Sequence, residues 1–348
     1  MDYSPGLRGV IAGETEISTV GMEGTSLRYR GYDAVGLTST NTYEDVASLI
    51  IDDDLDGELF KKSFSSHYQK LLEDSELIEL INRLKTEQHP MDVTRTAISY
   101  IGEANESNKL DAASKVTAIA CLAIASYNKE SSDVLDQQYT VASSLLPNSS
   151  TKQQLEALDD MLILYAEHGF NASTFAARVT ASTRSDLISA IVSGVGTLKG
   201  ELHGGANEAA VELINSFKTP EEAKEGVHKI LEDKKKIMGF GHGVYKIQDP
   251  RSPVVKNWVE ILSTSDKSIN KYEIAKTIDS VMDSEKKLFP NVDFYGGLLL
   301  SELGFGVDVF TPIFVAGRSV GWSAHYFEQR SQDTLIRPAA KYIGIQER

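Results

Sequence analysis

From Tyr43 onward, apolar residues recur three and four positions apart, and this spacing constrains the fold more than any other feature. Such a repeat places the apolar side chains on one face of an α-helix. It is clear in VASLIIDDDL, ELFKKSFSSHYQKLL, DSELIELINRL and KQQLEALDDMLILYAE. β-type runs are found within residues 6–32, where glycines separate short segments. The sequence therefore predicts a mainly α-helical protein with a small N-terminal β region.

Several helix boundaries can be placed from local signals. Asp74 and Ser75 supply a helix start, and Asp92 precedes another helix after the break at His89-Pro90. The alanine-rich segment 110–126 predicts a buried helix. Segment 128–150 is polar and predicts one short helix and a loop. Thr311 is predicted to cap a helix that has Pro312 at its first position.

Composition changes along the chain and suggests two domains. Residues 172–198 are rich in Ala, Ser, Thr and Gly, which let helices approach closely, so this region is expected at the packed centre. After Pro220 the chain carries more charge. We expect a large helical domain over residues 1–204, to which residues 306–348 return, and a small helical domain over residues 205–305.

The charge of the chain argues against two classes of partner. The 348 residues carry a formal net charge of −15, whereas nucleic-acid and anionic membrane surfaces call for a basic face. Cys121 is the one cysteine, so no disulfide can form within a chain. The sequence shows no signal peptide and no run of about 18 apolar residues, so we expect a cytoplasmic protein without a membrane span.

A glycine-rich stretch at residues 234–253, KKKIMGFGHGVYKIQDPRSP, is the first candidate site. His242 lies between Gly241 and Gly243, so little side-chain bulk covers its ring, and Lys246 and Arg251 follow closely. An imidazole beside fixed cations suits an anionic ligand on which proton chemistry is done. The alternatives are a solvated turn and a dinucleotide-binding loop. The G-x-G-x-x-G spacing of a dinucleotide-binding loop, however, fails here at its last glycine.

Two more histidines share this glycine signature. His168 is followed by one glycine and His203 by two, and both lie at breaks between helices. Asp293 is the matching acid, because apolar and aromatic neighbours should desolvate it, raise its pKa and suit it to general-base work. The simpler interpretation of Asp293 is a helix N-cap. The four other histidines are interpreted as surface or packed residues: His67, His89, His228 and His325.

A zinc site is the competing interpretation of the same residues. His168, His203, His242 and Asp293 are ligand types that zinc accepts. Catalytic zinc sites often place two ligands on one helix a few residues apart, and no two of these four lie so close. We therefore expect no metal.

Several motifs, taken together and in order, closely resemble the citrate synthase family, especially its shorter archaeal and bacterial form. They are LHGGANEAA, MGFGHGVYKIQDPR, PNVDFYGG, GRSVGWSAHYFEQR and LIRP, with RYRGYD, HPMDVTRTAIS and EHGFNAS in support. The resemblance covers nearly the whole chain and is weakest at residues 38–80 and 100–150. It implies a two-lobe helical fold and a homodimer.

The resemblance also implies a reaction, the condensation of acetyl-CoA with oxaloacetate and water to citrate and CoA. By resemblance, Asp293 removes a methyl proton of acetyl-CoA, and His203 stabilises the enol that forms. His242 polarises the oxaloacetate carbonyl and supplies a proton. Acetyl-CoA is a substrate here, and no cofactor is expected.

Binding residues are implied in the same way. His168, Arg251 and Arg318 match positions that hold the oxaloacetate carboxylates, and Arg337 matches an arginine that reaches this site from the other subunit. The CoA contacts implied are Ile237, Met238, Gly239, Phe240, Gly241 and Lys246.

The chain departs from the family pattern in places that bear on CoA. Gly243 stands where the short form commonly has arginine, Ala339 replaces a second basic residue after Pro338, and DDDLDGEL replaces the usual loop near residue 50. Two alternatives stay open. One is a 2-methylcitrate synthase that uses propionyl-CoA, and the other is a non-catalytic CoA-binding paralogue.

Overall fold

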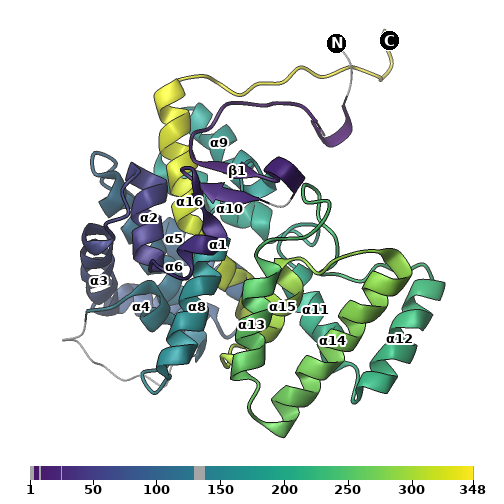
Figure 1. The fold of residues 1–348 in the computed structure, drawn as a ribbon. Coiled ribbons are helices and arrows are strands. Elements are labelled where there is room, and N and C mark those ends of the chain that lie inside the picture. Colours follow the sequence, from purple (N-terminus) through teal and green to yellow (C-terminus); the bar gives the residue numbers. More distant parts are fainter. Residues whose placement is uncertain (1–3, 8, 25, 129–137, 348) are drawn as a thin grey trace.

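The computed structural model describes residues 4–7, 9–24, 26–128 and 138–347, and helices dominate it (Figure 1). The α-helices are α1 (Ala34–Leu37), α2 (Tyr43–Asp52), α3 (Glu58–Leu72), α4 (Ser75–Leu84), α5 (Pro90–Tyr100), α6 (Lys109–Asn128), α7 (Val141–Leu145), α8 (Lys152–Tyr165), α9 (Ala172–Ser182), α10 (Leu187–Leu198), α11 (Ala206–Asn215), α12 (Pro220–Glu232), α13 (Ser252–Leu262), α14 (Asp266–Lys286), α15 (Val292–Glu302) and α16 (Phe310–Gln332). The mainly α-helical prediction is confirmed.

The predicted β region is a three-stranded antiparallel sheet of β1 (Ser18–Val20), β2 (Leu27–Tyr29) and β3 (Tyr32–Asp33), in the order β1-β2-β3. Gly21 and Gly24 turn the chain between β1 and β2 with φ of 72° and 84°, values that glycine adopts readily. The buried ring of Tyr29 anchors the sheet, because its hydroxyl donates to the carbonyl of Ile163 in α8 at 3.0 Å.

Helix α16 runs through the centre of the larger group of helices and is buried along most of its length (Figure 1). Small residues let its neighbours approach closely. A Cβ on Gly321 would lie 2.2 Å from the carbonyl of Ala166, and a Cβ on Gly194 of α10 would lie 3.0 Å from the ring of Trp322. The expectation that residues 172–198 belong to a tightly packed centre is confirmed, since α9 and α10 pack on each other and on α16.

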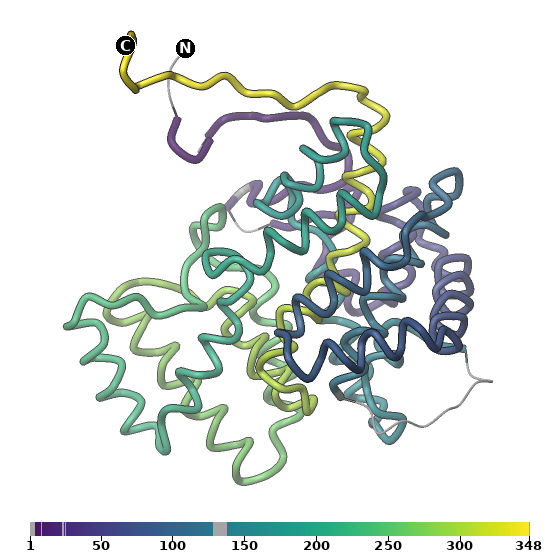
Figure 2. Tube along the Cα trace, turned by 180° about the vertical axis from the view of Figure 1, so that it is seen from behind, coloured from purple at the N-terminus to yellow at the C-terminus, as the bar shows by residue number. Residues whose placement is uncertain are grey.

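Helices α11 to α15 form a second group, which lies beside α8 and the lower end of α16 (Figures 1 and 2). The domain boundaries at residues 204 and 305 stay predictions. The N-terminal segment before β1 and the tail after α16 lie next to each other at the top of both views, away from α11–α15.

Two helix boundaries differ from the sequence predictions, and one helix was not predicted. Helix α5 begins at Pro90 rather than after Asp92, because the ring of His89 caps it by accepting from the amide of Met91 at 3.1 Å. Helix α16 begins at Phe310, so Thr311 is inside the helix and its hydroxyl instead donates to the carbonyl of Gly204. Helix α13 was not predicted; it begins at Ser252, at the end of the glycine-rich stretch.

Segment 128–150 holds the short helix α7, as predicted, although residues 129–137 lie outside the described part of the chain. Helix α6 is long and apolar enough to cross a membrane by length and composition alone. Most of it is buried against other helices, as in the core helix of a folded domain.

Candidate active site

The loop between α12 and α13 presents His242, and its glycines differ in their roles. Gly239 and Gly241 adopt φ of 86° and 72°, so this part of the loop needs the left-handed backbone that glycine permits. Gly243 has no such conformation, and a Cβ placed on it would meet no atom within 4 Å. The space beside His242 is therefore open on the side of Gly243.

The tautomer of His242 follows from its hydrogen bonds. The amides of Val244 and Tyr245 both point at Nδ1, at 3.1 Å and 3.2 Å. A backbone amide can only donate, so Nδ1 accepts and the ring proton lies on Nε2. Burial, with the charge of Arg251, lowers the pKa of His242 to about 4. His242 is thus neutral near pH 7 and can donate a hydrogen bond from Nε2.

The His242 loop is fastened to the start of α15. The amide of Gly241 donates to the carbonyl of Phe289 at 2.8 Å, and the amide of Asn291 donates to the carbonyl of Gly239 at 2.9 Å. The side chain of Asn291 then caps α15, since its Oδ1 accepts from the amide of Asp293 at 3.0 Å. Asp293 is therefore not the N-cap, and the simpler interpretation of this residue is wrong.

Asp293 lies on the first turn of α15 with only partial access to solvent. Burial raises its pKa from 3.8 to about 6, although Arg251 and Arg318 pull in the opposite direction. The expected desolvation of this carboxyl is confirmed. A carboxylate with a pKa near 6 is ionised at neutral pH and is more basic than an exposed aspartate.

His203 lies in the turn between α10 and α11. Its Nε2 is 2.8 Å from the hydroxyl of Ser173 and accepts from the amide of Ser173 at 3.3 Å. The ring proton is therefore on Nδ1. Burial and the charge of Arg318 lower the pKa of His203 to about 4. This second neutral imidazole has its Nδ1–H available as a donor.

His168 follows the end of α8, where Gly169 turns the chain with φ of 58°. Its ring packs edge-on against that of His242, with 5.1 Å between the centroids, and its Nε2 lies 3.0 Å from the hydroxyl of Tyr245. Burial and the charges of Arg251 and Arg318 hold its pKa well below the usual value for histidine. The two arginines that act on Asp293 therefore also act on His168.

The two buried arginines are held in different ways. Arg251 forms a two-pronged ion pair with Asp249, at 2.9 Å from Nε and 2.8 Å from NH2. Asp249 also accepts from the amide of Val292 at 3.0 Å, so it ties Arg251 to α15. Arg318 projects from α16, and its Nε donates to the carbonyl of Tyr165. Both cations act on His168 and Asp293, and Arg251 also acts on His242.

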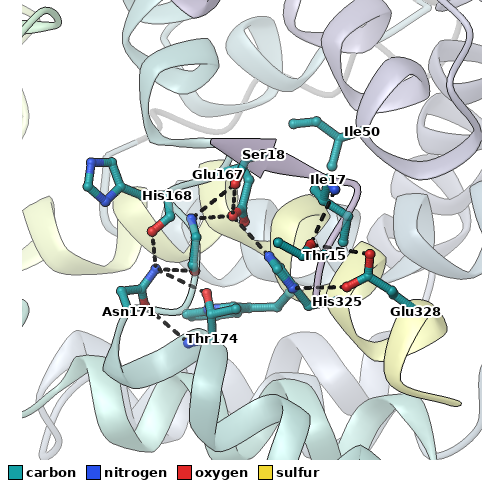
Figure 3. A network of polar contacts seen from close by, with 12 residues as sticks. Thr15, Ile17, Ser18, Ile50, Glu167, His168, Asn171, Thr174, His325 and Glu328 are labelled. Carbon is teal, nitrogen blue, oxygen red and sulfur yellow. Dashed lines mark hydrogen bonds and ion pairs between the residues drawn. The ribbon is translucent and has the colours of Figure 1, made fainter. Parts of the chain in front are cut away.

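A second polar network lies behind His168. Figure 3 shows Glu167 in contact with His325 and Ser18, while the imidazole of His168 points away from these contacts. The ring of His325 contacts Glu167 at 2.9 Å through Nε2 and accepts from Arg178 at 2.9 Å through Nδ1. His325 is fully buried within this network, which confirms that it is a packed residue.

The remaining candidates lie outside this cluster. Arg337 is exposed in the tail after α16. Ile237 is buried, and the ring of Phe240 packs on that of Phe294 with 4.5 Å between centroids. Lys246 is exposed, and its amine donates to the carbonyl of Gly243 at 3.1 Å. Their roles toward CoA and oxaloacetate stay predictions.

The zinc alternative lacks a ligand set. Within the described ranges, no three His, Cys, Asp or Glu side chains are arranged to hold a metal ion. The arrangement instead combines two neutral imidazole donors, one carboxylate and two buried arginines. Such a set can remove a weakly acidic proton and stabilise the negative charge that develops on a carbonyl oxygen.

Four residues around the site were not identified from the sequence: Ser173, Tyr245, Asp249 and Asn291. The signal for Asn291 was present, since asparagine two residues before Asp293 is a common N-cap. Asp249 lies in the stretch at residues 234–253, but its ion pair with Arg251 was not predicted. Nothing local in the sequence marks Ser173 or Tyr245, because their partners lie 30 and 77 residues away.

The known proteins that this chain resembles in sequence and in structure are citrate synthases and 2-methylcitrate synthases. Residues 6–339 match the family model described as "Citrate synthase, C-terminal domain". A 2-methylcitrate synthase of Shewanella oneidensis is 40% identical, over 99% of this chain and 95% of the relative. A citrate synthase of Mycolicibacterium smegmatis is 36% identical, over 99% and 96%. Among solved structures, the citrate synthase of Thermoplasma acidophilum was determined in a ternary complex with carboxymethyl coenzyme A and oxaloacetate. It has a TM-score of 0.88 at 29% identity, and the match covers 100% of this chain and 97% of that chain.

Proposed function

The chain belongs to the citrate synthase family, and on that premise we propose that it condenses an acyl-CoA with oxaloacetate and hydrolyses the product to release CoA. The observation that carries the proposal is that two buried arginines act on all three groups: Arg251 on Asp293 and His242, and Arg318 on Asp293 and His203. Each of these three groups has the protonation state that its step requires at neutral pH.

The first step is removal of a proton from the carbon next to the thioester. Such a proton is very weakly acidic, so a carboxylate can take it only if the developing enolate is stabilised as it forms. Asp293 is ionised near pH 7 and acts as the base. His203 donates from Nδ1 to the thioester oxygen, because its Nε2 is already engaged by Ser173.

The second step is attack of the enol on the ketone of oxaloacetate. His242 donates from Nε2 to the ketone oxygen and so increases the electrophilicity of the carbon. Arg251 and Arg318 bind the two carboxylates, for which paired N–H donors are well suited. His168, whose ring packs against that of His242 and whose pKa both arginines lower, completes the oxaloacetate side of the site.

CoA would lie against the segment from Ile237 to Gly241, with Lys246 near a phosphate. In the part of the chain that the structure describes, Lys246 is exposed and its backbone amide donates to the carbonyl of Gly24 at 3.4 Å. The open space at Gly243 leaves room for CoA where the short form commonly has arginine.

The sequence motifs and the relatives differ on whether the acyl group is acetyl or propionyl. The motifs imply acetyl-CoA, whereas the relative at 40% identity is named a 2-methylcitrate synthase and the one at 36% a citrate synthase. One extra methylene is discriminated by only about 1–3 kcal/mol in an apolar pocket. We propose that the enzyme accepts propionyl-CoA as well as acetyl-CoA.

We propose a homodimer in which Arg337 completes the partner's oxaloacetate site. The supporting observation is the tail after α16, which leaves the body of its own chain and runs away from α11–α15 (Figures 1 and 2). Arg337 belongs to this tail and is exposed. Ile343 is 89% exposed and Tyr342 71% exposed, so the tail presents apolar side chains that a second copy could cover.

The test of the acyl preference is a comparison of kcat/KM for acetyl-CoA and propionyl-CoA, each with oxaloacetate, by release of the free CoA thiol. Turnover of both within about a hundredfold supports the proposal, since a larger ratio exceeds what one methylene supplies. The same assay with EDTA tests the expected absence of a metal. Loss of turnover on chelation, restored by zinc, would contradict it.

A further inference from the structure

Tyr245 lies among three residues of the oxaloacetate side of the site. It is buried, and its hydroxyl is 3.0 Å from Nε2 of His168. Its ring is tilted by 31° to the ring of His242, with 4.6 Å between the centroids. The guanidinium carbon of Arg251 is 5.9 Å from the centre of the same ring.

The contact between Tyr245 and His168 joins two segments that are far apart in sequence. His168 belongs to the loop after α8, whereas Tyr245 belongs to the loop between α12 and α13. The backbone of Tyr245 adds a further link, since its amide donates to Nδ1 of His242. Tyr245 therefore helps to set the tautomer of His242 through its backbone and contacts His168 through its side chain.

The phenol suits this position chemically. Burial raises the pKa of Tyr245 to about 12, so the hydroxyl keeps its proton near pH 7 and can either donate or accept. His168 is held neutral by burial and by Arg251 and Arg318. A neutral imidazole against a neutral phenol gives a hydrogen bond without adding charge to a site that already holds two buried cations.

We propose that Tyr245 is a positioning residue for oxaloacetate binding, whose hydroxyl orients the ring of His168 while its own ring supports His242. The inference rests on the proposed function, in which His168 contacts oxaloacetate. Without the hydroxyl, the imidazole of His168 can rotate about its side-chain bonds and spends less time in the orientation that binds the substrate.

The two parts of Tyr245 have separable effects. Tyr245→Phe keeps the ring and removes only the hydroxyl, so KM for oxaloacetate should rise about three- to tenfold, as for loss of one hydrogen bond, with KM for acyl-CoA unchanged. Tyr245→Leu also removes the ring beside His242, so kcat should fall as well. This division between KM and kcat would not arise from a general loss of stability.

A double-mutant cycle with His168→Ala is the decisive test. If Tyr245 acts through His168, then Tyr245→Phe raises KM and the calorimetric Kd for oxaloacetate in the wild type but not in the His168→Ala background. The matched control is Tyr68→Phe in α3, which removes a buried hydroxyl that donates to the carbonyl of Ser144 at 3.2 Å. It should leave both constants unchanged.

Equal effects of Tyr245→Phe in the two backgrounds, or no effect in the wild type, would overturn the inference. These outcomes are distinct from failure of the proposed function, because that would appear as absent turnover in the wild type with both acyl-CoA substrates. If the wild type turns over and the effects of Tyr245→Phe and His168→Ala on oxaloacetate binding simply add, the proposed function stands and the role of Tyr245 is rejected.

Discussion

Asn291 donates its side-chain amide to the carbonyl of Gly241 at 3.0 Å, directly beside His242 in the chain. The same side chain accepts from the amide of Asp293, so one asparagine fixes the proposed base and the proposed carbonyl-polarising group relative to each other. A displacement of about 1 Å between reacting groups can cost about a hundredfold in rate. Together with the two backbone hydrogen bonds between the loop and the start of α15, the side chain of Asn291 therefore sets the separation of these two groups.

Removal of this side chain should affect rate more than stability. Asn291→Ala should lose about 1 kcal/mol of unfolding free energy through the missing N-cap and lower kcat by about tenfold or more. Asp186→Ala is a matched control, because Asp186 caps α10 by accepting from the amide of Ser189 and lies outside the proposed site. It should show a similar loss of stability with kcat unchanged. Equal kcat values for the two variants would contradict the role of Asn291.

The pH dependence of the reaction follows from the pKa values of the site. Asp293 must be ionised to act as a base, and its pKa is raised to about 6 by burial. As pH falls through this value the carboxylate gains a proton, so kcat/KM should fall about tenfold per pH unit below pH 6. His203 and His242 have pKa values of about 4 and stay neutral over that range. A profile that stays flat down to pH 5 would show that Asp293 is not the titrating base.

Arg318→Leu should weaken oxaloacetate binding. The variant removes a partner of a substrate carboxylate, for which a charged hydrogen bond supplies about 1.5–3 kcal/mol, so KM for oxaloacetate should rise about ten- to a hundredfold. It also leaves the carbonyl of Tyr165 without this donor, which should cost some stability. Arg95→Leu is a control, because Arg95 forms a surface ion pair with Asp92. An unchanged KM for oxaloacetate in Arg318→Leu would reject its assignment.

The proposed sharing of sites between subunits can be tested by complementation. Arg337→Ala and Asp293→Asn subunits should each be nearly inactive alone. After exchange, each mixed dimer holds one site with both defects and one with neither, so activity should return to about half of the wild-type value per mixed dimer. Native mass spectrometry would establish that mixed dimers are present. A mixture that contains them and stays inactive would show that Arg337 serves its own subunit.

Much of the fold and several site residues could be predicted from the sequence. The helices follow from their apolar spacing, and His168, His203 and His242 are marked by glycines that interrupt those helices. The start of α16 was misplaced because Thr311 has the residue type of a cap, whereas its hydroxyl bonds to Gly204, more than a hundred residues away in sequence. Local patterns carry no information about such distant partners.

The protonation states of the site could be predicted only in part. Apolar neighbours of Asp293 in the sequence correctly indicated a raised pKa. The tautomers of His203 and His242 depend on which backbone amides donate to each ring. The amide of Ser173 in α9 reaches His203, and the amide of Tyr245 reaches His242, only in the folded chain. The convergence of Arg251 and Arg318, from different elements, likewise arises from tertiary packing.

The most direct test of the account is release of free CoA thiol by the wild type and by Asp293→Asn, with oxaloacetate and either acetyl-CoA or propionyl-CoA. The account predicts oxaloacetate-dependent thiol release by the wild type. It predicts a loss of at least about a hundredfold in kcat for Asp293→Asn, as expected when a general base is removed, with the calorimetric affinity for oxaloacetate retained. Near-wild-type turnover by Asp293→Asn, or no thiol release by the wild type with either substrate, would contradict it.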